Sequence, residues 1–399
     1  MTGRWRISSL AAVFVATGLL AACSIAGTPI SRPIDVRVLD VGPYPLTRHD
    51  YDRPAGSYGA QVEGMRMSAA LVPDVQIDPM LAVGRAGGVL SDNNAAVQLG
   101  GVPAAAKAVL TREGMLVGYA VNGSDTPGSG PNPAETALTC TLLRFPDAAH
   151  AERAATELEA ADLASAPDQN RTLTLTDYAA AQVHWRPGTP SIGAYLAHGE
   201  FVLRVSVRRP VADENDLLGW VRRAFDMQLA AVDKFKPTPA KDFAALRIDE
   251  EGMLARSMVG QRDDRNPDIE VFAVYSTNYL TATSTDSVTW QRILQDAGAD
   301  AMSYLEYDTL FRVRDAQAGH GLVAAVTLLR HTRYRDMDSP AHVPDAQCLA
   351  LDPKAPAAGF PPYKCYLAYG RYVDVLNDHD KTNILHRTAA EYALLADSF

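Results

Sequence analysis

The order of hydrophobic and polar positions occurs twice along the chain. The segment 142–148 aligns with 310–316, and 195–202 aligns with 366–373. The two matches follow each other in the same order and at nearly the same separation in both copies. Two matches in register indicate a duplicated structural unit.

Each copy predicts the same succession of elements. An apolar run indicates a strand, and an aspartate at its end is suited to cap the alanine-rich helix that follows. A later strand with alternating polarity is preceded by Gly199 or Gly370, which fits a tight hairpin. An amphipathic helix closes each copy. The predicted ranges are 137–145, 147–164, 201–207 and 217–229 in the first copy, and 305–313, 315–330 and 384–395 in the second.

Further elements are predicted ahead of each matched core. In the first copy they are a strand over 36–41, a helix near 103–112 and a strand near 115–121, and the second copy has a strand over 271–275 and a helix near 286–297.

These elements predict an α+β fold of two related repeat units, each an antiparallel sheet with packed helices. The run Lys-Pro-Thr-Pro over 236–239 ends the first closing helix, because proline restricts both itself and the preceding residue. The expected organisation is a signal peptide over 1–22, a lipidated tether over 23–33, an N-terminal α+β domain over 34–235, a linker over 236–267 and a C-terminal α+β domain over 268–399.

The N-terminal segment 1–23 resembles a bacterial lipoprotein signal. Arg4 and Arg6 precede an apolar run over 7–20, which is short for a membrane span. The tetrapeptide Leu-Ala-Ala-Cys over 20–23 resembles a lipobox, in which the cysteine takes a diacylglycerol. The alternative is a plain secretory peptide with a chance cysteine. The lipobox implies a lipid anchor at Cys23 that holds the protein on the extracytoplasmic face of the cell membrane.

Composition narrows the class of protein. The chain has 399 residues, of which 47% are hydrophobic, so it is too apolar for a disordered tail and too polar for a multi-span membrane protein. Lysine and arginine number 37 against 47 acidic residues, which gives a formal net charge of −10. Because nonspecific binding to nucleic acid needs a basic surface, no nucleic-acid partner is expected.

Three cysteines remain once Cys23 is lipidated. Cys348 and Cys365 flank a short loop rich in proline and alanine, so we expect a disulfide between them rather than two free thiols. Cys140 lies in an apolar run and is interpreted as a buried small hydrophobic residue.

Several short motifs together resemble one protein family. They occupy 38–45, 235–239, 252–255, 370–373 and 391–396, so the resemblance spans nearly all of the chain after the signal. The family consists of cell-envelope lipoproteins of mycobacteria, nocardiae and their relatives. The resemblance implies an actinobacterial cell surface, and it supplies no activity and no catalytic residues. The repeated units are also similar in architecture to extracellular sensor modules of that phylum, which does not fix function.

Common catalytic motifs are absent from the sequence. There is no Gly-x-Ser-x-Gly, His-Glu-x-x-His, Ser-x-x-Lys or Gly-Lys pair, so we expect no catalytic residue of these classes, no metal and no cofactor. The segment 264–268 lacks the glycine of a calcium loop and is interpreted as linker. We interpret 378–380 as a helix cap, 49–53 as a solvated loop and the basic run 330–335 as a helix end.

One hypothesis for a ligand site follows from the repeat alone. His198 and Tyr369 occupy equivalent positions, so if the units face each other, they and Arg204 or Arg371 would border a shared cleft. The function expected is non-enzymatic binding of an envelope lipid, glycan or protein partner. The alternatives are an envelope hydrolase with a non-standard site, marked by titratable groups converging in one pocket, and an assembly protein with an exposed apolar patch.

Overall fold

The computed structural model describes residues 34–128, 132–164, 169–260, 265–306, 308–356 and 359–397. Residues Asp35–Phe399 form one compact unit, to which the following description refers. The predicted signal peptide, the lipidation site at Cys23 and the tether lie outside the described residues. Within the described ranges, no helix is both long and apolar enough to span a bilayer.

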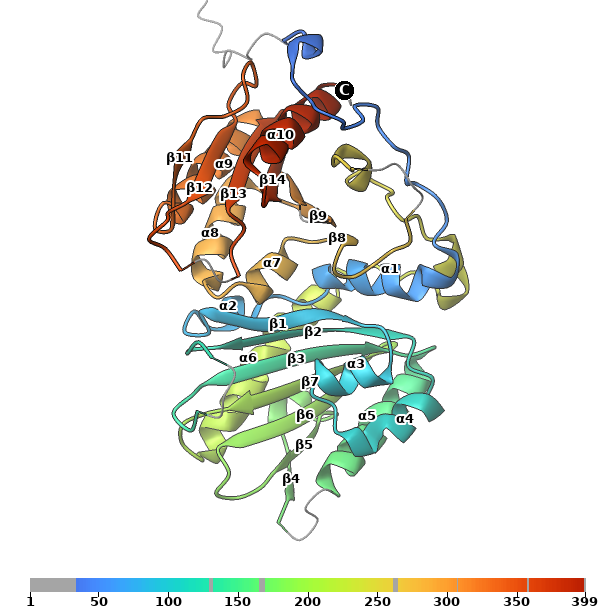
Figure 1. Ribbon diagram of the computed structural model, residues 1–399. Coiled ribbons are helices and arrows are strands. Elements are labelled where there is room, and N and C mark those ends of the chain that lie inside the picture. The colour runs from blue at the N-terminus through green and yellow to red at the C-terminus, as the bar shows by residue number, and fades with distance from the viewer. Residues whose placement is uncertain are drawn as a thin grey trace, which may run out of the picture. The chain divides into compact units, whose positions relative to one another are not determined.

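The described residues form two antiparallel sheets of seven strands each, with helices packed against them (Figure 1). This confirms the predicted α+β fold of two related units. The first sheet has the order β1-β2-β3-β7-β6-β5-β4 and the second has the order β11-β12-β13-β14-β10-β9-β8. The strands of the first sheet are β1 (Val83–Leu90), β2 (Val117–Ser124), β3 (Ala137–Arg144), β4 (Arg171–Leu173), β5 (Gln182–Trp185), β6 (Ser191–His198) and β7 (Phe201–Arg208). Those of the second are β8 (Phe272–Tyr275), β9 (Ala301–Leu305), β10 (Asp308–Arg312), β11 (Tyr334–Met337), β12 (Gln347–Leu351), β13 (Tyr363–Tyr369) and β14 (Tyr372–Asp378).

The two sheets have the same connectivity. When the second order is read backwards, β8 to β14 take the places of β1 to β7 one by one. The last two strands of each sheet form a hairpin that turns at Gly199 or Gly370, and both glycines have positive φ, 57° and 54°. The duplication inferred from the sequence therefore extends to every strand of both sheets.

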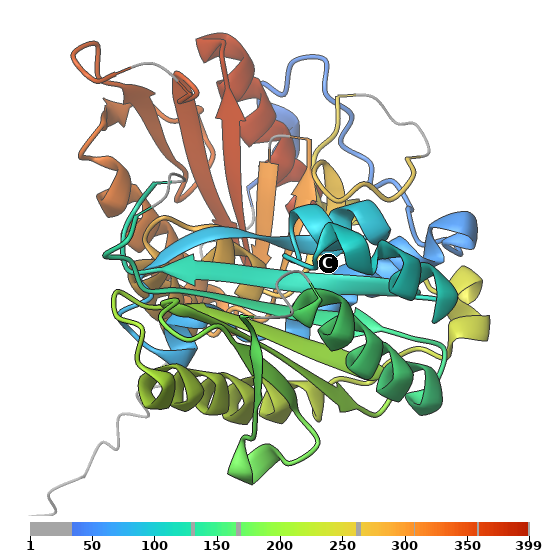
Figure 2. The ribbon, with the colours of Figure 1, turned by 90° about the horizontal axis from the view of Figure 1, so that it is seen from below.

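Four long helices cover the sheets. They are α5 (Ala148–Leu163), α6 (Glu214–Val232), α9 (Ala316–Arg330) and α10 (Lys381–Ala396). Each begins after an aspartate whose carboxylate accepts a hydrogen bond from the backbone N–H three positions later, as the predicted caps require. Figure 2 shows α5 and α6 on opposite sides of the first sheet. The shorter helices are α1 (Gly59–Arg66), α2 (Asp74–Ile77), α3 (Asn93–Gln98), α4 (Lys107–Arg112), α7 (Asn278–Thr283) and α8 (Ser287–Ala297).

One strand prediction began too early, and another was wrong. The range 305–313 contains a turn between β9 and β10, where Glu306 takes a positive φ of 59° and reverses the chain. The range 36–41 contains a 3₁₀ turn over Val36–Val38 instead of a strand, with the Asp35 carboxylate accepting from the Arg37 N–H at 3.1 Å. Alternating polarity predicts a strand only where a neighbouring strand pairs with it, and the pattern cannot supply that neighbour.

One hydrophobic core runs through both halves of the chain. Helix α7 packs on β1, and backbone hydrogen bonds cross between the halves from Gly84 N–H to Ser284 O at 2.7 Å and from Ser287 N–H to Ala82 O at 2.9 Å. A Cβ added at Gly84 would lie 2.2 Å from the carbonyl oxygen of Ala282, so this close approach requires glycine.

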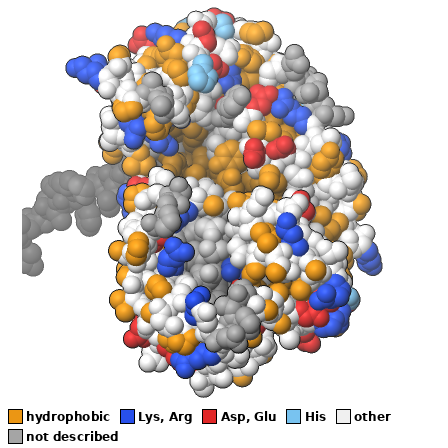
Figure 3. Space-filling model, turned by 60° about the horizontal axis from the view of Figure 1, so that its bottom comes forward, with side chains coloured by type: hydrophobic (Ala, Val, Ile, Leu, Met, Phe, Trp, Pro, Cys, Tyr) orange, Lys and Arg blue, Asp and Glu red, His pale blue; other side chains and the backbone are white. Residues whose placement is uncertain are grey.

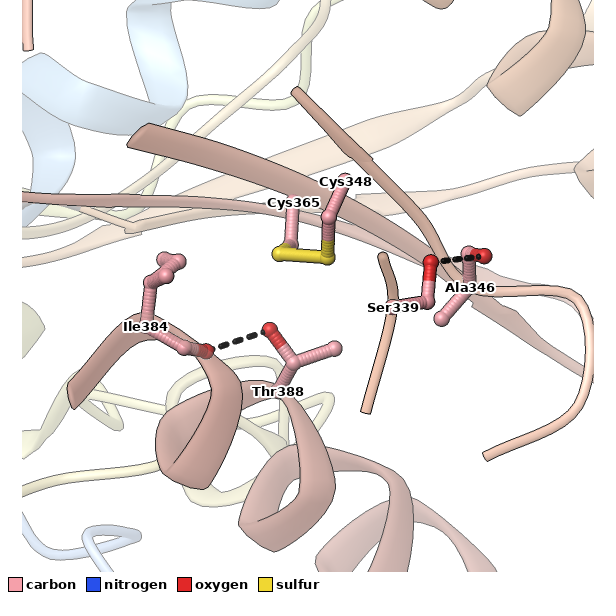
Figure 4. Close-up of a disulfide and its surroundings, with 6 residues drawn as sticks. All are labelled: Ser339, Ala346, Cys348, Cys365, Ile384 and Thr388. Carbon is pink, nitrogen blue, oxygen red and sulfur yellow. Dashed lines mark hydrogen bonds between the residues drawn. A yellow bond between two sulfur atoms is a disulfide. The ribbon is translucent and has the colours of Figure 1, made fainter. Parts of the chain in front are cut away.

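The expected disulfide joins Cys348 and Cys365, which are paired across β12 and β13. Figure 4 shows the bridge beside α10, near Ile384 and Thr388. Cys140 is fully buried, as expected for a small hydrophobic residue. Figure 3 shows charged side chains of both signs scattered among hydrophobic ones on one face of the molecule.

Candidate functional site

A cavity of about 820 Å³ opens at one end of the second sheet. It is framed by the β9–β10 turn, the start of β13, the end of β14 and the first turns of α10. The N-terminal segment also reaches it, because Tyr44 donates a hydrogen bond from its hydroxyl to Asn383 Oδ1 at 2.6 Å. The lining residues are Tyr44, Gly260, Glu306, Gly359, Phe360, Pro361, Lys364, Asn377, Asp378, His379, Asn383 and Arg387.

Arg387 organises the inner wall of this cavity. Its guanidinium pairs with Asp308 at 2.5 Å and with Asp378 at 3.0 Å, and it donates to the Asn377 carbonyl at 2.7 Å. Asn383 donates to the same Asp378 carboxylate at 2.7 Å. Burial opposes the charge of Arg387, but the interactions with the Asp308 and Asp378 carboxylates together outweigh burial and raise the pKa of the arginine. The charge of Arg387 is therefore satisfied within the protein.

Lys364 differs from Arg387 because no carboxylate of the described residues forms an ion pair with it. Its ammonium group donates to Asn377 Oδ1 and lies 5.9 Å from the centre of the Tyr334 ring. Burial, with a smaller contribution from the charge of Arg330, lowers the pKa of Lys364 to about 8. At neutral pH the cavity thus holds a cation that forms no ion pair with a carboxylate in the part of the chain that the structure describes.

Three carboxyl groups lie beneath α10, behind Arg387. Burial raises the pKa of Asp374 to about 7 and raises the pKa values of Asp308 and Glu391 as well. The nearby Asp374 carboxyl adds to burial in raising the pKa of Glu391, and Glu391 accepts a hydrogen bond from the Met258 N–H at 2.6 Å. Met258 packs against α10, and it lies two positions before Gly260, which lines the cavity. The three carboxyl groups therefore support one side of the cavity.

The cavity combines an unbalanced cation with aromatic and proline surfaces. That arrangement suits a ligand with an acidic group and an apolar body. Nowhere in the described ranges do histidine, cysteine and acidic side chains gather in a group able to hold a metal ion.

The four residues proposed from the repeat have separate surroundings. His198 contacts Asp233 at 2.7 Å, and Tyr369 lies edge-on against Tyr392 with ring centres 5.4 Å apart. Arg371 donates to the Val313 carbonyl at 3.0 Å. Arg204 is buried in the first half, where it donates to the Tyr195 hydroxyl at 3.0 Å. Each of these contacts lies within one half of the chain.

The other segments singled out from the sequence have structural roles. Asp380 caps α10, as predicted. The basic run 330–335 begins at the end of α9, as predicted, but its last two residues lie in β11. The expectation of a solvated loop over 49–53 fails at Tyr51, which is 2% exposed because its ring packs edge-on against Phe272 at 5.0 Å.

Sequence reasoning did not select Lys364 or Arg387. Arg387 lies in the predicted closing helix, whereas Lys364 lies in β13, a strand for which no range was predicted, and neither belongs to a motif with a recognisable spacing. The one available signal was the run 378–380 before the last helix, because Asp378 and His379 do line the cavity.

Comparisons with known proteins match this chain over two adjoining regions. A family described as domain of unknown function DUF7373, N-terminal, matches residues 50–248, and its C-terminal counterpart matches residues 253–398. No curated protein matches the chain. The crystal structure of the extracellular domain of PknH from Mycobacterium tuberculosis is similar at 15% identity and a TM-score of 0.27, over 42% of this chain and 93% of that one, which is too low to support an assignment of function. The two matched regions together extend over most of the sequence, and the chain therefore belongs to the DUF7373 family.

Proposed function

We propose that this protein is a lipid-anchored cell-envelope lipoprotein of an actinobacterium that binds a small molecule without transforming it. The ligand carries an acidic group on an apolar body, and it occupies the cavity at the end of the second sheet. The lipobox-like segment over 20–23 supports the anchor and the extracytoplasmic location.

The observation that carries the proposal is the ammonium group of Lys364. A partly buried cation loses hydration, and a carboxylate or phosphate of a ligand restores a favourable partner. The side chains of Tyr44, Phe360 and Pro361 offer apolar surface beside it. The cavity volume of about 820 Å³ lies in the range of small-molecule sites.

A second candidate, an envelope hydrolase, is favoured by one observation. Lys364, Asp378 and Arg387 all line this cavity, and the pKa of each is shifted. Asp378 and Arg387 neutralise each other at 3.0 Å, which leaves Lys364 as the group available for proton transfer.

Native mass spectrometry of the full chain, purified in detergent from an actinobacterial host, tests the proposal. We expect a discrete added mass on the wild-type protein that is lost on denaturation. Lys364→Met should lower its occupancy by about tenfold, whereas Lys234→Met, at an exposed lysine of the first half, should leave it unchanged. Circular dichroism of both variants confirms that they fold.

Three outcomes contradict parts of the proposal. A bare wild-type protein would exclude tight binding of a small ligand and direct attention to a protein partner. Equal occupancy in Lys364→Met would remove Lys364 from the site. Recovery of the ligand as cleavage products would favour the hydrolase.

A further inference from the structure

A second cavity, of about 250 Å³, lies on the first sheet. It opens beyond the end of α5, on the sheet face that this helix covers, and strands β5, β6 and β7 form its floor. Its lining is mostly polar and consists of Asp162, Asn170, His184, Trp185, Arg186, Thr189, Ser191, Ile192, Gly193, Arg204 and Ser206.

Gly193 gives this cavity its depth. It is paired between His184 on β5 and Ser206 on β7, so three neighbouring strands contribute one residue each. A Cβ added at Gly193 would lie 3.2 Å from Cε1 of the His184 ring and 3.8 Å from Oδ2 of Asp162. The missing side chain therefore leaves the space that a ligand would fill.

The guanidinium of Arg204 is a buried positive charge in the wall of this cavity. Arg204 is 7% exposed, and its recorded hydrogen bonds go to neutral groups: the Tyr195 hydroxyl at 3.0 Å and the Gly100 carbonyl at 3.4 Å. Among the described residues, no carboxylate forms an ion pair with Arg204, although an unpaired buried charge is costly.

Two other buried arginines of this chain show how the fold treats such a charge elsewhere. Arg144 pairs with Glu63 at 2.6 Å and with Glu200 at 2.7 Å, and Arg387 likewise has two carboxylate partners. Of these three buried arginines, Arg204 is the one that lines a cavity and has no carboxylate partner among the described residues.

The carboxylates near Arg204 are directed toward other groups. Asp162 accepts a hydrogen bond from the Tyr195 hydroxyl at 3.1 Å, and Glu159 contacts His184 Nδ1 at 2.7 Å. Burial lowers the pKa of His184, but its contacts with Glu159 and Asp162 outweigh burial, so the net shift is upward and favours the imidazolium. Glu159 and Asp162 therefore have the His184 imidazolium as their cationic neighbour.

We propose that this cavity is a second binding site, which takes a small hydrophilic molecule with one carboxylate or phosphate group. The oxyanion pairs with Arg204, and the hydroxyl and amide groups of Ser206, Ser191 and Asn170 bind the polar body. The site is independent of the cavity that contains Lys364, because it lies on the other sheet.

Isothermal titration calorimetry on the full chain tests this site with four probes: inorganic phosphate, glucose 6-phosphate, glucuronate and uncharged glucose. We expect at least one charged probe to bind and glucose not to bind. The ranking of phosphates against glucuronate identifies the preferred oxyanion. Arg204→Met should weaken binding by at least about tenfold, and Arg204→Lys should keep part of it. Arg292→Met, at an exposed arginine of the second half, should have no effect.

Gly193→Ala covers the case in which Arg204→Met fails to fold. It keeps the guanidinium and adds a methyl group to the cavity floor beside the His184 ring, so it should weaken binding severalfold with an unchanged circular dichroism spectrum. The proposal is overturned if no charged probe binds at millimolar concentration, or if Gly193→Ala binds as tightly as the wild type. Lys364→Met should leave this binding intact, which separates the present test from that of the proposed function.

Discussion

At the scale of single residues, this protein buries an unusual set of charges and gives each a different environment. Arg144 and Arg387 are each paired with two carboxylates, whereas Arg204 and Lys364 line cavities and form no ion pair with a carboxylate of the described residues. A buried ion pair contributes little net stability, because the loss of hydration offsets the Coulomb attraction. The two cations without carboxylate partners therefore mark binding sites better than the neutralised arginines do.

The buried pair of Asp374 and Glu391 predicts a dependence of stability on pH. The folded-state pKa of Asp374 is raised to about 7, so the folded protein holds a proton that the unfolded chain releases at lower pH. The free energy of unfolding should therefore fall as pH rises from about 4 to 7, and Glu391→Gln should make that fall smaller, because burial also raises the pKa of Glu391. Thermal unfolding across this pH range measures it.

Glu152→Gln, at an exposed glutamate of α5, is the matched control and should keep the wild-type pH dependence. If Glu391→Gln also keeps it, Glu391 does not hold a buried proton in the folded state.

At the scale of secondary structure, local signals were sufficient wherever an element is defined by its own residues. The aspartate caps, the hairpin glycines and the amphipathic periods correctly placed the four long helices and the central hairpins. The polarity pattern did not reveal the turn at Glu306, where the backbone has positive φ, or the short 3₁₀ segment at Val36–Val38, which the Asp35 carboxylate caps.

The disulfide between β12 and β13 carries a prediction at this scale. Its cysteines have a sequence separation of 17, so replacing Cys348 and Cys365 together by alanine should lower the free energy of unfolding by about 3 kcal/mol. Chemical denaturation measures the loss. A reductant should destabilise the wild type and leave the double variant unchanged. Equal midpoints for the wild type with and without reductant would contradict a stabilising bridge.

At the scale of the whole molecule, a duplicated architecture carries two different sets of polar groups. The alignment of 195–202 with 366–373, extended in both directions, places Lys364 at the position of Gly193 and Val375 at the position of Arg204. The cation that lines the cavity is Arg204, on β7, in the first half and Lys364, on β13, in the second. The duplication has therefore kept the strand order and changed the chemistry, which fits two sites for different ligands.

The contact between the halves predicts the effect of a substitution at Gly84. A methyl group there would overlap the Ala282 carbonyl, so Gly84→Ala should lower the free energy of unfolding by about 1 to 3 kcal/mol. Thermal or chemical unfolding measures it. Gly219→Ala, which meets open space on helix α6, should instead be neutral or stabilising by up to about 1 kcal/mol. A neutral Gly84→Ala would show that the halves do not pack this closely.

The sequence by itself determined the duplication, the α+β class, the capped helices, the hairpins and the disulfide. Those features depend on spacing and local propensity, which a linear pattern records. Tertiary structure alone decided which polar side chains meet. One cavity is lined by Lys364, Arg387 and Tyr44, because the N-terminal segment crosses to α10. The other is lined by Arg204 and Gly193, because β5, β6 and β7 pair in one register. Such contacts join residues that are distant in sequence, and no period or motif along the chain encodes them.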